Sequence, residues 1–254
     1  MRDQRQSGRR TLRRAAAFLG VAAVILATIA VPRAQTRSDA QIRADIERHI
    51  HDLLGSSRIS VTVAGHVVTL DGTVPNLWTK RQIIERSRKT AGVEEVDSTL
   101  EIAQGENDAR LAEEVGKRLR SYALYTVFDY VDGRVVNGVV TLTGAVTSTL
   151  KQDELAERVE KIAGVRELKN ELKLLPVSRS DDQLRIRIAN LIYSDPLFDN
   201  YSRATPPIHI VVEHGHVTLF GIVSSQIEKR KAETVARGMP GVFSVDDRIQ
   251  VTTR

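Results

Sequence analysis

The feature that most constrains the fold is a hexapeptide that recurs three times along the chain. It reads VVTLDG at residues 67–72, VVTLTG at 139–144 and HVTLFG at 216–221. Each closing glycine is followed twenty residues later by a Gly-Val pair, at 92–93, 164–165 and 241–242. Three matches with the same internal spacing indicate an internal repeat, so the 254 residues are predicted to form three small modules.

A helix is predicted before each hexapeptide. In each repeat a polar residue that could cap the helix stands four positions ahead of an apolar stripe with i, i+4, i+8 spacing. The caps and stripes are Ser38 with Ile42, Ile46 and Ile50; Asn107 with Leu111, Val115 and Leu119; and Ser180 with Leu184, Ile188 and Ile192.

The hexapeptide itself is predicted to be the return strand of a β-hairpin. The turn signals are Gly65-His66, Asn137-Gly138 and His214-Gly215. The Asn-Gly pair is typical of a type I′ turn, because both central residues of that turn need a positive φ.

A second helix and a last strand complete each repeat. Apolar side chains recur inside the second helix at Ile83, Leu155 and Ala232, and the Gly-Val pair is expected to end that helix as a left-handed C-cap. The order helix, strand, strand, helix, strand predicts an α+β fold: three tandem αββαβ modules, each a small mixed three-stranded sheet covered on one face by two helices.

The expected modules span residues 37–103, 106–175 and 179–254, with short linkers between them. The third module is longer because of a loop over residues 195–207, which contains Tyr201 and Pro206-Pro207.

Residues 1–34 are predicted to be an export signal. Six arginines precede an uncharged stretch from 15 to 31, which is the layout of a secretory signal that is cleaved after Ala30 or Ala34. The alternative is that residues 15–31 stay in place as an inner-membrane anchor, since seventeen apolar residues are close to the length of a spanning helix. Either way, the prediction is a protein exported to the periplasm.

Charge and cysteine content exclude several kinds of site. Without residues 1–30, the chain carries 31 basic and 31 acidic side chains (37 less 6, and 32 less 1), so the body lacks the positive field of a nucleic-acid binder. There are no cysteines, which excludes disulfides, thiolate catalysis and cysteine-ligated zinc.

The repeat resembles the BON domain, a module named for bacterial osmotic-stress and nodulation proteins. The resemblance rests on NGVVTLTG at 137–144, on Gly164-Val165 and on the strand LKNELKL at 168–174 with Asn170. Ser98 and Asp247 stand where the family usually has this asparagine, which questions that local turn. The resemblance implies an αββαβ module of bacterial envelope or periplasmic proteins, associated with phospholipid binding and with osmotic or envelope stress. Its pattern contains no catalytic residues.

Catalytic, cofactor and metal sites are not expected from the residues either. His214 and His216 are interpreted as surface residues of a hairpin, because no third ligand accompanies them. Asp181 and Asp182 are interpreted as helix capping, since adjacent residues on a helix diverge. The chain has none of the common nucleophile, phosphate-loop or zinc-protease motifs, and we expect it not to be an enzyme.

The candidate contact residues lie at the start of the second helix in repeats one and three. They are Leu77, Lys80, Arg81, Lys229 and Arg230. Basic side chains beside an apolar residue are typical of a membrane-surface contact, and the alternative is an ordinary solvated helix face. Trp78 aligns with Leu150 and Ile227 and is therefore expected in the core.

The predicted function is that of an exported, non-catalytic envelope-binding protein that contacts anionic phospholipid in envelope maintenance or stress. The alternative is a periplasmic adaptor or chaperone-like holdase that binds envelope proteins. Nucleic acid is not an expected partner.

Overall fold

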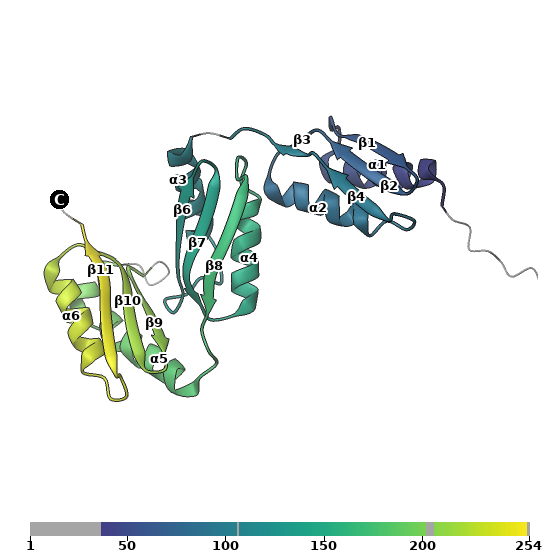
Figure 1. Cartoon of the computed structure of the whole chain (residues 1–254). Coiled ribbons are helices and arrows are strands. Elements are labelled where there is room, and N and C mark those ends of the chain that lie inside the picture. Colours follow the sequence, from purple (N-terminus) through teal and green to yellow (C-terminus); the bar gives the residue numbers. More distant parts are fainter. Residues whose placement is uncertain (1–36, 106, 202–205, 253–254) are drawn as a thin grey trace, which may run out of the picture. The chain divides into compact units, whose positions relative to one another are not determined.

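The computed structural model describes residues 37–105, 107–201 and 206–252, which belong to one compact unit of the chain. Three modules of the same design follow one another along this unit (Figure 1). Module 1 consists of α1 (Asp39–Leu54), β1 (Ser60–Ala64), β2 (Val67–Asp71), β3 (Thr73–Val74), α2 (Leu77–Arg88), β4 (Glu95–Ser98) and β5 (Glu101–Ile102). Module 2 consists of α3 (Asp108–Arg120), β6 (Tyr130–Val136), β7 (Val139–Val146), α4 (Thr149–Glu160) and β8 (Glu167–Leu174). Module 3 consists of α5 (Arg179–Tyr193), the 3-10 turn η1 (Pro196–Phe198), β9 (Ile208–Glu213), β10 (His216–Val223), α6 (Gln226–Arg237) and β11 (Ser244–Val251).

The hexapeptide forms the central strand of each sheet. In module 2, β7 pairs antiparallel with β6 and parallel with β8, and the strand orders β1-β2-β4 and β9-β10-β11 repeat this arrangement. The second helix makes the crossover between the two parallel strands. Each main sheet is therefore mixed and three-stranded, and the predicted α+β fold is confirmed. In module 1, β3 and β5 form a separate two-stranded continuation beyond Gly72.

Each module has its own apolar core between the sheet and its two helices. The three stripes of the first helices are buried, as predicted, and so are Ile83, Leu155 and Ala232 of the second helices. On the hexapeptide strands the second and fourth positions face this core, and Val140 and Leu142 are completely buried there. The alternation follows from the two-residue period of a strand.

The hairpin turns also match their sequence signals. Both central residues have positive φ in all three turns, and the non-glycine ones are His66, Asn137 and His214 with φ of 68°, 52° and 52°. A histidine in this conformation is uncommon. It is nevertheless one of the side chains that adopt positive φ more often than most, and the other central residue of each turn is glycine.

Two helix boundaries differ from the sequence prediction. The N-cap of α5 is Ser178, whose side chain accepts a hydrogen bond from the Asp181 amide, and not Ser180, because the helix begins half a turn earlier. The second helices end four residues before the Gly-Val pair, and the caps that follow them, such as Lys161, have right-handed geometry. Gly164 instead has φ 85° within a turn closed by a bond from Val165 N to Ile162 O, and glycine tolerates that position.

The position of the last strand at which the family usually has asparagine has the same role in all three modules. Asn170 accepts a hydrogen bond from the amide two residues further on, at Leu172. Ser98 and Asp247 accept the corresponding bonds from Leu100 and Ile249. The departures from asparagine therefore preserve this local bond.

An aspartate in the first helical turn clamps the hairpin turn of every module. Asp39 accepts hydrogen bonds from the amides of residues 65 and 66, Asp108 from those of 137 and 138, and Asp181 from those of 214 and 215. Asp181 is thus more than a helix cap, because it ties the start of α5 to a turn more than thirty residues away. The clamp fixes the helix over the sheet in each module.

This clamp should make module 3 sensitive to acid. Burial disfavours the Asp181 carboxylate, but the amides of Gly215 and His214 outweigh it and hold the pKa of Asp181 below its ordinary value of 3.8. Because the folded-state pKa is lowered, the stabilisation is complete above about pH 4 and is lost as the pH falls further. Asp181→Asn should lose about 1 to 3 kcal/mol in the free energy of unfolding at pH 7. It should also lower the dependence of stability on pH below about pH 4, measured by urea unfolding.

The exposed Asp199 of the same module provides the control. Asp199→Asn should leave both quantities unchanged. Equal effects of the two substitutions would contradict the role of the clamp.

Candidate functional site

The second helices of the three modules differ in charge although they occupy the same place in the fold. α2 carries four cations and one acid, and α6 carries four cations and two acids. α4 instead carries two cations and four acids. A shared framework explains neither the basic character of α2 and α6 nor the acidic character of α4, so this difference marks the helices on which a charged partner can be sought.

An apolar side chain lies in the first turn of each second helix. Leu150 and Ile227 are 56% and 67% exposed, and Trp78 at the same position is half-buried. The expectation that Trp78 occupies a core position is therefore wrong, because its equivalents point away from their cores. The ammonium group of Lys161 lies 4.6 Å from the centre of the indole ring.

Two of the candidate contact residues in module 1 are engaged with residues of module 2. Leu77 is partly buried and packs against the apolar core of that module. The guanidinium of Arg81 forms an ion pair with the buried carboxylate of Glu160. Lys80, the third candidate, is half-buried and makes no ion pair with any residue that the structure describes.

In module 3, Lys229 has a structural role. Its ammonium group donates to the carbonyl of Ile249, 2.5 Å away, and so ties α6 to the last strand. Gln152 makes the corresponding bond to the carbonyl of Leu172 in module 2, although it has no charge. Arg230, the remaining candidate, is exposed to solvent.

A further group of cations was missed by the sequence interpretation. Arg86, Arg88 and Lys89 are exposed at the carboxyl-terminal end of α2. The signal was present in the run RSRK at residues 86–89, because the equivalent positions of the other repeats do not hold three cations. Cations at a helix end are also favoured by the helix dipole, and this makes such a run easy to overlook.

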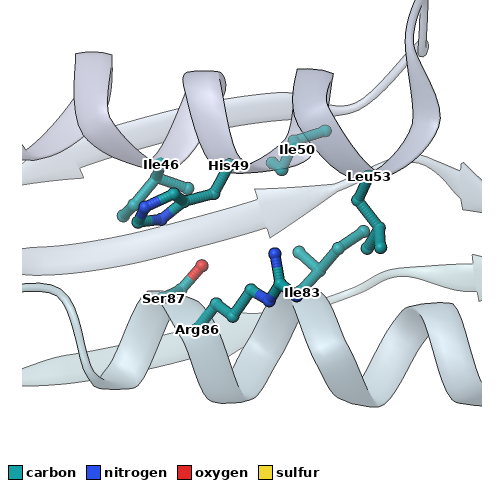
Figure 2. Close-up of a pocket in the computed structure, with 7 residues that line it drawn as sticks. All are labelled: Ile46, His49, Ile50, Leu53, Ile83, Arg86 and Ser87. Carbon is teal, nitrogen blue, oxygen red and sulfur yellow. The ribbon is translucent and has the colours of Figure 1, made fainter.

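Figure 2 shows a narrow crevice between α1 and α2, with apolar walls and with His49, Arg86 and Ser87 from the two helices. It has no room for a water molecule. The crevice is therefore a packed contact between two helices, and not a ligand pocket.

In module 2 the position that corresponds to Leu53 is occupied by Tyr122. This tyrosine is buried under the guanidinium of Arg158, and burial raises its pKa to about 12.

The histidines and acids form no metal centre within the described ranges, where no three such side chains gather at one point. His214 and His216 are both exposed at the hairpin of module 3, and His216 bonds to Ser244. The predicted surface position of this pair is confirmed.

None of the helices in the described part of the chain is long and apolar enough to cross a membrane. The predicted export signal at 1–34 and the alternative anchor at 15–31 lie outside the described residues.

Comparison with solved structures finds matches of low similarity. The C-terminal domain of CdsD, a structural protein of the type III secretion system of Chlamydia trachomatis, is 15% identical, and the match covers 85% of this chain and 100% of that one with a TM-score of 0.25. The periplasmic domain of PrgH is 12% identical, with 81% and 96% coverage and a TM-score of 0.19. No curated protein matches the chain.

Comparison with family models gives a clear result. The BON domain model matches the chain three times, over residues 38–104, 107–176 and 180–253. The matches follow the three structural modules and cover most of the sequence. The chain therefore belongs to the BON domain family and carries three tandem copies of the domain.

Proposed function

We propose that this chain is an exported, non-catalytic protein that contacts anionic phospholipid surfaces of the cell envelope through a basic second helix. Family membership supports the envelope setting, because BON domains are in general envelope-associated and bind phospholipid. The observation that carries the proposal is the charge of the second helices. Cations exceed acids by three on α2 and by two on α6, whereas α4, the second helix of module 2, is acidic.

The chemistry of these helices suits a lipid surface. Basic side chains attract anionic headgroups, and an exposed apolar residue such as Ile227 can enter the interfacial region beside them. α4 has the same apolar residue but repels anions, and so provides an internal contrast.

Vesicle co-sedimentation tests this proposal. Residues 37–254 should sediment with vesicles that contain phosphatidylglycerol but not with vesicles of phosphatidylcholine alone, and raising the salt concentration should weaken the binding. The omission of residues 1–36 removes any contribution from the apolar N-terminal segment.

Equal sedimentation with the two kinds of vesicle, or none with either, would contradict the proposal. In that case, capture of envelope proteins without lipid would favour the adaptor or holdase function.

A further inference from the structure

We infer that module 1 makes the lipid contact, through the basic end of α2 formed by Arg86, Arg88 and Lys89, and that its partner is a bilayer surface rich in anionic phospholipid. This inference rests on the proposed function and assigns it to one module. It shifts the contact away from the residues at the start of the helices, which the sequence had favoured.

The first argument is the availability of the cations. In α6, Lys231 pairs with Asp195 at 2.8 Å, Arg237 pairs with Glu233 at 2.7 Å, and Lys229 donates to the carbonyl of Ile249. These three cations therefore already have partners within module 3. Arg230 is the only cation of α6 that has no acceptor among the described residues.

By contrast, Arg86, Arg88 and Lys89 are all exposed, although Arg86 also lines the crevice against α1, and no acidic side chain among the described residues forms an ion pair with any of the three. A cation that already has a partner must exchange it for a headgroup, whereas an unpaired cation gives up only water.

The second argument is that the basic end is specific to module 1. The equivalent positions in module 2 hold Arg158, Glu160 and Lys161, of which Arg158 covers Tyr122 and Lys161 pairs with Glu157 at 2.5 Å. In module 3 they hold Val235, Arg237 and Gly238, so that one cation remains and it is paired. The same helix end therefore has free cations only in module 1, within the part of the chain that the structure describes.

The third argument identifies the class of partner. Successive residues of a helix are rotated by about 100°, so Arg86 and Lys89 share one side of the helix end while Arg88 lies on another side. The three side chains therefore fan out in two directions and do not all converge on one point. A small anion needs convergent donors, as in a closed phosphate site. A bilayer surface instead offers many separate phosphates, and long flexible cationic side chains can each reach one of them. The charge and the fan-like arrangement together fit an anionic bilayer.

Matched neutralisation of the two basic helices tests the assignment, with residues 37–254 and vesicles of phosphatidylglycerol and phosphatidylcholine. Each cation near an anionic surface contributes about a fivefold gain in affinity, so Arg86→Gln/Arg88→Gln/Lys89→Gln should weaken binding about 100-fold. The control Arg230→Gln/Lys231→Gln/Arg237→Gln removes the same charge from α6 and should change binding by no more than about fivefold. Arg86→Lys/Arg88→Lys keeps the charge and should retain the affinity of the parent chain.

The outcomes separate the inference from the proposed function. If the parent chain does not prefer anionic vesicles, the proposed function fails. If the parent chain binds, and the α2 variant binds equally well while the α6 variant does not, the function stands and the assignment to α2 is wrong. Thermal unfolding of each variant shows whether a loss reflects charge or unfolding. A folded α2 variant with the predicted loss supports the inference.

Discussion

Replacing Gly144 with alanine is expected to unfold module 2 under conditions in which the parent chain is folded. Gly144 closes the hexapeptide and has a φ of 119°, a conformation that residues with a side chain rarely adopt. A Cβ atom there would lie 2.1 Å from the carbonyl oxygen of Tyr130, which belongs to the adjacent backbone and cannot move aside. Backbone strain of about 1 to 3 kcal/mol adds to an overpacking cost of similar size, so the expected loss is about 2 to 6 kcal/mol.

Urea unfolding followed by circular dichroism measures this loss, and Gly116 in the same module serves as the control. Gly116 lies within α3, where an added Cβ meets only the mobile end of the Arg120 side chain. Gly116→Ala should therefore preserve stability or raise it by up to about 1 kcal/mol, through better helix propensity. Similar losses for both variants would show that the closing glycine has no special role.

Removing the buried carboxylate of Asp129 is expected to have a comparable effect. Asp129 is completely buried and accepts bonds from Thr126, from Thr147 and from the ammonium group of Lys151, 2.6 Å away. Burial disfavours this charge, yet the bonds from Lys151 and the two threonines outweigh it and hold the pKa of Asp129 below its ordinary value. Asp129→Asn would leave Lys151 largely buried without a counter-charge, and so should cost about 3 to 5 kcal/mol.

The double variant Asp129→Asn/Lys151→Met tests whether the unpaired Lys151 causes this loss of stability, because it removes the cation as well. It should be more stable than Asp129→Asn alone, while the exposed Asp132→Asn should change stability by less than about 0.5 kcal/mol. A double variant no more stable than the single one would contradict the importance of the pair. Chemical unfolding curves of the four proteins supply all of these quantities.

The framework of each module was predictable from sequence because its signals are local and are repeated three times. The apolar stripes, such as Ile42 with Ile46 and Ile50, identify a buried helix face by their spacing alone. The closing glycine and the paired positive-φ turn residues identify the hairpin by conformational preference. Repetition adds weight, since a pattern seen in three copies is not an accident of composition.

The sequence-based predictions differ from the structure at side chains that can adopt more than one environment. The sequence predicts a core position for Trp78 because the aligned position is apolar in all three repeats, yet the first turn of a helix can expose such a residue, as it does Leu150 and Ile227. The sequence predicts a surface charge at Lys229, but its long side chain reaches back to the carbonyl of Ile249. Neither outcome is encoded in residue type, because the direction of a side chain depends on the neighbouring strand.

The sequence by itself determined the three repeats, the order of their elements, the core positions and the family. These properties follow from periodicity and backbone preference, which act over a few residues. Only the tertiary structure decided which cations are free to bind a partner, because several of the groups that engage them, such as Asp195 and the carbonyl of Ile249, are distant in sequence. Lys231 meets Asp195 across the helix pair of module 3, whereas no such acid reaches the basic end of α2 from the residues that the structure describes.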